Sequence, residues 1–191
     1  INKFFIIIFM KKKITISFIG NSAKFKKVFK SIYPNSILKS YSWRLLGDIL
    51  IKQKIKSRSD IIVVCGYDYS SQWYSYQKYY NYNIVYPLKF AKMISKNKTK
   101  VFYVDTINKI TRIKNSKKRY TFSRYEFAKK ELRTKLLRNF KFIKILTLPV
   151  LTNNYKADVH GGVFSKIIYN LLINLNYIKI IDLKNLKKLI S

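Results

Sequence analysis

Residues 61–65 read Ile-Ile-Val-Val-Cys, between Asp60 and Gly66, and form the clearest strand pattern in the sequence. A short, continuous apolar run with polar or turn residues at both ends is typical of a central parallel strand, because such a strand is buried on both of its faces. The sequence therefore predicts a parallel sheet built around this segment.

The segments on either side alternate between strand and helix patterns. Residues 14–33 begin with a β-rich run, turn at Gly20 and continue as a helix whose Phe25, Val28 and Phe29 fall at helical spacing. Further strands are predicted at 36–42, 99–104, 142–148 and 177–181, further helices at 85–94, 122–137 and 164–175, a loop or short helix at 45–55, and a surface loop at 109–119. This alternation predicts an α/β fold, a Rossmann-like parallel sheet flanked by helices. Residues 14–19, 61–65, 101–104 and 142–146 are expected to be adjacent strands, with the helix after Tyr120 packed across one face.

The chain length favours one domain. A chain of 191 residues buries a sizeable core but is too short for two comfortable domains. We predict a single domain over residues 10–191, with Met10 as a candidate natural start and residues 1–9 upstream of it. The substrate-side portion is expected to be much reduced, because the sequence ends soon after residues 182–183.

Cysteine use and hydropathy favour a cytoplasmic protein. Cys65 is the only cysteine and His160 the only histidine, which excludes a disulfide framework or a His/Cys zinc cluster within one chain. The apolar run at residues 4–9 is far shorter than the ~20 residues that span a bilayer. Its basic residues follow it, whereas those of a signal peptide precede the apolar run. We therefore predict no transmembrane segment.

The charge has two competing explanations. Lys and Arg number 40 against 8 Asp and Glu, a net charge of +32. An AT-biased coding sequence would enrich Lys, Asn, Ile, Tyr and Phe together, whereas selection for a polyanion, such as RNA, DNA or an anionic membrane surface, would enrich cations alone. The many Tyr, Asn and Ile residues favour the first explanation, but they leave the shortage of acidic residues unexplained. Lys outnumbers Arg, and this counts against a specialist in bidentate phosphate recognition.

Residues 120–132 carry the main motif, Tyr-Thr-Phe-Ser-Arg-Tyr-Glu-Phe-Ala-Lys-Lys-Glu-Leu. It resembles the Tyr-x-x-Ser-Lys motif that opens a long helix in the extended short-chain dehydrogenase/reductase family, which includes NAD-dependent sugar-nucleotide epimerases and dehydratases. The resemblance extends with gaps over residues 14–190. Residues 60–66 resemble the strand leading to the cofactor-side loop, residues 83–88 a helix start that carries an Asn, and residues 102–106 the strand whose end supplies a catalytic Ser or Thr.

The resemblance implies catalytic roles for three residues. Tyr120 would be the acid/base, Arg124 would lower the pKa of Tyr120 and contact the ribose in place of the usual Lys, and Thr106 would orient the substrate oxygen. Arg keeps the positive charge but is bulkier and presents a planar fork. An alternative register, Tyr125 with Lys129, matches Tyr-x-x-x-Lys literally but loses the Ser before the basic residue, so we prefer Tyr120.

The cofactor turn is eroded. The family's Gly-x-x-Gly-x-x-Gly turn lets a pyrophosphate approach the backbone at a helix N-terminus, and here its three positions are Gly20, Ala23 and Lys26. We therefore expect the binding of NAD or NADP to be weak or lost. The interval from Gly20 to Gly47 is also one strand and one helix shorter than the resemblance to the family implies. The cofactor-binding residues that the resemblance implies are Gly20, Ala23, Asp48, Cys65, Gly66 and Asn83.

Two function classes remain open. The first is an NAD(P)-dependent sugar-nucleotide epimerase, dehydratase or reductase-like protein, acting on a nucleotide sugar in surface-polysaccharide biosynthesis. The second is a non-catalytic, basic Rossmann-like module that binds RNA or a protein partner. A basic face centred away from the carboxyl ends of the strands would favour the second class.

Overall fold

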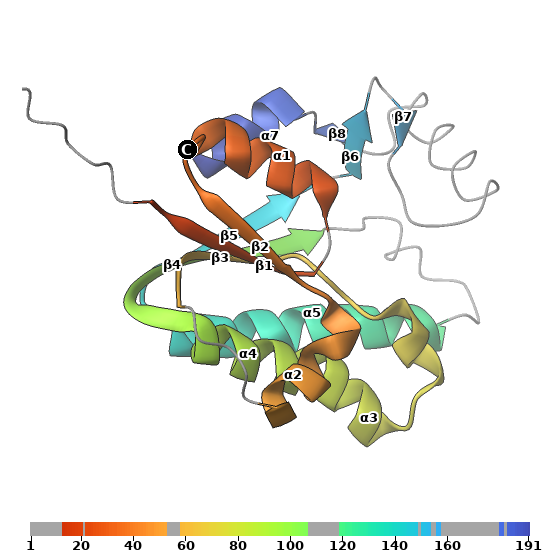
Figure 1. Cartoon of the computed structure of the whole chain (residues 1–191). Helices are drawn as coiled ribbons and strands as arrows, with labels where there is room; N and C mark the ends of the chain where they lie inside the picture. Colours follow the sequence, from red (N-terminus) through yellow and green to blue (C-terminus); the bar gives the residue numbers. More distant parts are fainter. Residues whose placement is uncertain are drawn as a thin grey trace, which may run out of the picture.

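The computed structural model describes residues 13–20, 22–52, 58–106, 119–148, 150–153, 156–157, 180–181 and 183–191 (Figure 1). Its elements, in chain order, are β1 (Thr15–Ile19), α1 (Ala23–Ile32), β2 (Ile37–Tyr41), η1 (Trp43–Leu45), α2 (Leu46–Lys52), β3 (Ser59–Val64), η2 (Tyr69–Trp73), α3 (Tyr76–Tyr80), η3 (Asn81–Val85), α4 (Tyr86–Ile94), β4 (Ser95–Thr106), α5 (Arg119–Asn139), β5 (Ile143–Leu148), β6 (Val150–Asn153), β7 (Lys156–Ala157), β8 (Ile180–Ile181) and α7 (Leu183–Ile190).

The main sheet has five parallel strands in the order β2-β1-β3-β4-β5. The predicted α/β class is confirmed, and the four segments expected to be adjacent strands are β1, β3, β4 and β5. The chain passes from β1 outward to β2 and then returns to β3 on the other side of β1. The strand order therefore reverses between β1 and β3, and in open parallel sheets ligands bind beyond the carboxyl ends of the strands at such a switch point.

Helices cover both faces of this sheet (Figure 1). On one face, α1 and α7 pack Phe29 and Leu186 against Phe18 of β1 and Phe102 of β4. On the other face, α2, α4 and α5 pack their apolar side chains against Val64 and other core residues. Because side chains alternate between the faces of a strand, β3 is buried on both sides, as its apolar run predicts.

The helix N-termini and turns follow local sequence signals. Ser22 caps α1 by accepting a hydrogen bond from the amide of Phe25, and α1 buries Phe25, Val28 and Phe29 on one side. Pro87 stands in the first turn of α4, where its missing amide proton costs no hydrogen bond.

Some elements differ from the sequence prediction. The Tyr-rich polar stretch at residues 67–83, for which the sequence predicts neither a helix nor a strand, contributes to η2, α3 and the π-helix η3. Between Gly20 and Gly47 the described residues contain one complete helix–strand unit, α1 and β2. The predicted helix at 164–175 and most of the predicted loop at 109–119 lie outside the described residues.

After β5, the described residues form a small three-stranded sheet, β7-β6-β8, followed by α7. None of the helices described is long and apolar enough to cross a membrane.

Candidate functional site

Two glycines lie in contact at the switch point between β1 and β3. Gly20 follows β1 with a φ of 106°, and a Cβ on it would lie 2.8 Å from the backbone nitrogen of Gly66, after β3. A Cβ on Gly66 would lie 2.3 Å from Cε3 of Trp43, which follows β2. Both positions therefore exclude a side chain, because the ends of three neighbouring strands are packed together here.

Backbone hydrogen bonds fix the ends of the same strands. The amide of Gly20 donates to the carbonyl of Tyr41 at 3.0 Å, and the amide of Cys65 donates to the carbonyl of Ile19 at 2.9 Å. Trp43 is 6% exposed, and its indole Nε1 is buried without a hydrogen-bond partner among the described residues. A buried, unpaired donor costs about 1–3 kcal/mol, so this atom is a point where an acceptor would be stabilising.

Two lysines, Lys24 and Lys26, lie near the start of α1. Ala23 is exposed at the first position of the helix, whereas Lys24 and Lys26 are partly buried. The ammonium group of Lys26 is near enough to Cys65 to oppose the rise in the pKa of that thiol, which burial raises to about 12. A helix N-terminus beside cationic side chains favours a phosphate group.

A second lysine reaches the same edge of the sheet from α5. Lys129 Nζ donates to the carbonyl oxygen of Val104 at 3.1 Å and lies 5.2 Å from the ring centre of Tyr103. Burial lowers the pKa of Lys129 to about 8, while the nearby Asp105 and Cys65 oppose this shift. Lys129 is therefore near the balance between its charged and neutral forms at neutral to mildly alkaline pH.

Tyr125 lies one helical turn before Lys129 and faces the same way. The Lys129 Nζ is 5.8 Å from the centre of the Tyr125 ring. That ring meets Tyr67 edge-on at 4.8 Å and is nearly parallel to Tyr69, with centroids 6.1 Å apart. The structure thus brings together the pair of the alternative register, beside Cys65 and the loop after β3.

Arg124 points into that loop from a neighbouring side of α5. Its Nη1 donates to the carbonyls of Gln72 at 3.1 Å and Tyr74 at 2.9 Å, with a longer bond to Ser71. Its guanidinium lies 5.2 Å from the ring of Tyr79, whose hydroxyl donates to the carbonyl of Arg124. These contacts tie residues 71–74 to α5.

The other two predicted catalytic residues are placed by their backbone alone. Tyr120 stands in the first turn of α5, and Thr106 is the last residue of β4 and pairs with Leu148. Thr106 is therefore at the carboxyl edge of the sheet. Their side chains lie outside the described part of the structure.

Asn83 supports the loop after β3 from within η3. Its Oδ1 accepts from the amide of Asp68 at 3.0 Å, and its Nδ2 donates to Ser71 Oγ and the carbonyl of Tyr79. Asp68 is buried and pairs with Arg44 Nε at 3.2 Å. This network explains the buried Asn, and it positions the loop that carries Tyr67 and Tyr69.

The predicted cofactor residues therefore fall into two groups. Gly20, Cys65 and Gly66 come together at the switch point, with Ala23 at the start of the adjacent helix. Asp48 is exposed in the first turn of α2, where a carboxylate favours the helix N-terminus, and Asn83 is enclosed in its own hydrogen-bond network. Trp43 could stack on a base or sugar by its residue type alone, but packing in the core is the more common role of such a residue. Its place at the switch point carries no spacing signal in the sequence.

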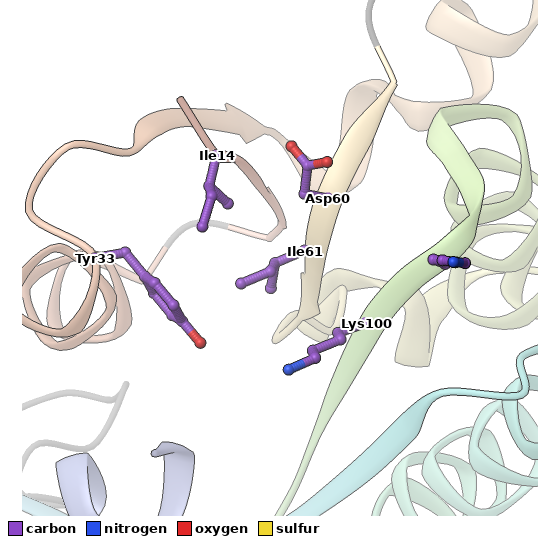
Figure 2. A pocket seen from close by; sticks show the side chains of 6 residues that line it. Ile14, Tyr33, Asp60, Ile61 and Lys100 are labelled. Carbon is purple, nitrogen blue, oxygen red and sulfur yellow. The ribbon is translucent and has the colours of Figure 1, made fainter. Parts of the chain in front are cut away.

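An open hollow of about 280 Å³ lies at the opposite edge of the sheet (Figure 2). Figure 2 shows the hydroxyl of Tyr33 and the amine of Lys100 directed toward each other across it, with Ile14 and Ile61 alongside. Its lining residues include Ile14, before β1, and Ile61, near the amino end of β3, so the hollow is distinct from the switch point. Asp60, which also lines it, is engaged by the amide of Thr15 and by Lys96 Nζ at 2.7 Å.

The fold and the switch point define a Rossmann-like α/β protein. Within the described residues, no cluster of His, Cys, Asp and Glu side chains is arranged to hold a metal ion. No protein-family model matches the sequence, and no curated protein matches it. The structure is similar to that of the capsular polysaccharide assembling protein CapF from Staphylococcus aureus, with a TM-score of 0.49 and 11% sequence identity. The match covers 91% of this chain and 48% of CapF, so the chain spans about half the length of that protein.

Proposed function

We propose that this protein is a reduced short-chain dehydrogenase/reductase-like protein that binds a nicotinamide dinucleotide at the β1/β3 switch point, with Tyr125 and Lys129 as its reactive pair. The observation that carries this proposal is the position of Lys129. Its ammonium group lies at the carbonyl of Val104, near Cys65 and the ring of Tyr125, at the edge of the sheet where parallel α/β proteins bind ligands.

The residues at the switch point fit a phosphate-bearing ligand. Gly20 offers a backbone without a side chain, the N-terminus of α1 offers amide groups, and Lys26 offers a cation. The buried Nε1 of Trp43 is a donor that a ligand oxygen would satisfy. Against tight binding, Gly20 and Gly66 are already packed on each other and on Trp43, so we expect low affinity.

The residues after β2 favour NADP over NAD. In dinucleotide-binding folds a carboxylate accepts a hydrogen bond from the ribose 2′-hydroxyl of NAD, whereas a nearby Arg accommodates the 2′-phosphate of NADP. Here β2 is followed by Ser42, Trp43 and Arg44, with no carboxylate among them. The side chain of Arg44 is 65% exposed despite its pairing with Asp68, so it remains accessible to a phosphate.

The pair on α5 would supply proton chemistry. The bound nicotinamide would exchange hydride, while Tyr125 would donate or accept a proton at the substrate oxygen. The cation of Lys129 would favour the phenolate form of Tyr125 and would bond a ribose hydroxyl. By resemblance the substrate class is a nucleotide sugar, and the process is surface-polysaccharide biosynthesis. In this proposal Arg124 stabilises the loop after β3 through its hydrogen bonds, and Tyr120 has no catalytic role.

The test uses Trp43 as the reporter. The chain has two tryptophans, so a Trp73→Phe background leaves Trp43 alone at the switch point. We expect NADPH to change its fluorescence and to bind about tenfold more tightly than NADH, since a hydrogen bond to a charged group contributes roughly 1.5–3 kcal/mol. Arg44→Gln should remove that preference, whereas Arg138→Gln, which removes an exposed Arg at the end of α5, should keep it.

Catalysis is tested separately. Tyr125→Phe should leave NADPH binding unchanged and abolish any turnover of a panel of UDP- and dTDP-sugars, whereas Tyr120→Phe should retain it. Loss of turnover in Tyr120→Phe alone would instead identify Tyr120 and Arg124 as the catalytic pair. If neither NADPH nor NADH perturbs Trp43 at any attainable concentration, the nucleotide site does not exist.

A further inference from the structure

The acidic residues are unevenly distributed over the described part of the molecule. They lie on α2, on or beside β3, on β4 and on α5. They are Asp48, Asp60, Asp68, Asp105, Glu126 and Glu131. The helices α1 and α7, with the sequences AKFKKVFKSI and LKNLKKLI, contain none. Within the described residues, the layer formed by these two helices therefore lacks the acidic side chains that α2 and α5 carry on the other side of the sheet.

These two helices lie side by side over one face of the sheet (Figure 1). Their apolar side chains are turned inward, since Phe25, Val28 and Phe29 of α1 and Leu186 and Ile190 of α7 are buried in one cluster. Their outer surfaces are therefore left to polar side chains. The exposed cations on them, which we call the lysine face, are Lys27, Lys30, Lys184, Lys187 and Lys188.

The lysine face has no balancing charge within its own helices. On α5, by contrast, Lys135 pairs with Glu131 at 3.2 Å across one helical turn. Like charges one turn apart on a helix surface repel each other, and a surface of one sign attracts ions of the other sign. A codon bias toward Lys does not by itself explain why acidic residues are retained on one side of the sheet and absent from the two helices on the other.

We propose that the lysine face binds the phosphodiester backbone of a nucleic acid. This inference is independent of the nucleotide site, because α1 and α7 present these lysines on the outer surface of the layer and not at the carboxyl ends of β1 and β3. Exposed Lys side chains are point charges that recognise phosphate without the planar geometry of Arg. Binding is therefore sequence-independent and strongly dependent on salt.

A bilayer surface is the less favoured occupant. A helix that lies in a membrane interface buries an apolar side in the acyl boundary, but the apolar sides of α1 and α7 are already buried against the sheet. Of the large hydrophobic side chains that are exposed in the described residues, only Leu189 belongs to either helix. The face offers charge and almost no apolar surface, which suits a solvated phosphate chain.

The experiment compares two variants with equal loss of charge. The first replaces the five residues of the lysine face with Gln. The matched control replaces five exposed cations on the opposite layer with Gln, namely Lys52, Lys89, Lys92, Lys130 and Arg138. Binding of a labelled 12-nucleotide oligo-U RNA is followed by anisotropy between 50 and 200 mM KCl.

The lysine-face variant should lose the larger part of the salt dependence. The salt dependence is the slope of the logarithm of the binding constant against the logarithm of the salt concentration, and each neutralised phosphate of a single strand contributes about −0.7 to it. Five lysines therefore contribute about −3.5, or roughly a 100-fold loss of affinity over this salt range. We expect the control to keep the slope of the unmodified protein within about 1. The α7 triple variant Lys184→Gln/Lys187→Gln/Lys188→Gln leaves α1 intact, and its slope should be less negative than that of the unmodified protein by about 2.

Three results would overturn this proposal. One is an equal weakening of RNA binding in both quintuple variants, which would show a diffuse charge effect. Another is the absence of salt-dependent binding in the unmodified protein. The third is selective loss of binding to vesicles containing 30% phosphatidylserine with RNA binding unchanged, which would assign the face to a membrane. NADPH titration of the lysine-face variant should match that of the unmodified protein, so failure of this proposal is separate from failure of the nucleotide site.

Discussion

Gly20 is held by two constraints at once. Its φ of 106° lies in the region that side chains disfavour, and a Cβ would come within 2.8 Å of the backbone of Gly66. The contact is with backbone on the far side of the switch point, so it is not relieved by a side-chain rotation. We expect Gly20→Ala to lower the free energy of unfolding by roughly 2–4 kcal/mol, measured by urea denaturation.

Gly47 provides the control for that measurement. A Cβ on Gly47 would lie 2.9 Å from the Tyr86 ring, which can move, and the backbone there is helical. Ala also stabilises a helix by about 1 kcal/mol relative to Gly, which offsets the contact. Gly47→Ala should therefore stay within about 1 kcal/mol of the unmodified protein. Equal destabilisation by the two substitutions would show that Gly20 is an ordinary turn residue.

Lys129 should give the protein a distinctive pH dependence. Burial lowers its pKa from 10.5 to about 8, so between these values the unfolded chain binds a proton that the folded chain has released. Stability then rises with pH, by at most about 1.4 kcal/mol per pH unit. Above pH 9 the thiol of Cys65 acts oppositely, because burial raises its pKa from 9.0 to about 12.

The window that isolates Lys129 is therefore pH 8–9. Urea midpoints of the unmodified protein should rise across it relative to those of Lys129→Met, which fills the same space without a titrating group. Parallel pH profiles for the two proteins would mean that Lys129 is solvated and has an ordinary pKa, and its proposed role beside Tyr125 would lose its basis.

At the scale of elements, α5 and the loop after β3 form one unit. Arg124 joins them through three carbonyl groups, and the Tyr79 hydroxyl donates back to the Arg124 carbonyl. Arg124→Ala should destabilise the protein by roughly 1.5–3 kcal/mol, because partly buried carbonyls lose a charged donor. Hydrogen exchange should quicken at residues 71–74 more than in the core strands. If Arg124→Ala abolished turnover and left stability and exchange unchanged, Arg124 would be catalytic, as the preferred register implies.

The sequence predicts the strands and long helices of this protein better than its site. The run at residues 61–65 and the spacing of Phe25, Val28 and Phe29 report burial directly, because the core selects apolar side chains. Residues 67–85 carry no such period. Their turns depend on Asn83, whose hydrogen bonds reach residues distant in sequence. The motif on α5 was ambiguous, since Tyr120 and Tyr125 both precede a basic residue by four positions and differ only in whether a Ser precedes that residue.

At the scale of the whole molecule, different surfaces suit different ligands. Gly20 and Gly66 follow β1 and β3, and Lys129 reaches the same edge of the sheet from α5. The helices α1 and α7 present cations on the outer side of one layer. The parallel sheet was predictable from the alternation of strands and helices. The distribution of charge was not, because it depends on which helices share a face of the sheet.

The central claim is that a dinucleotide binds at the β1/β3 switch point, and hydrogen exchange with and without saturating NADPH tests it most directly. Protection should concentrate in peptides covering residues 19–26, 41–45, 65–69 and 125–129, and should be absent from α7. Protection confined to α7 and α1, or to the hollow near Tyr33 and Lys100, would show that NADPH binds as a general anion on the basic surface. That result would contradict the account.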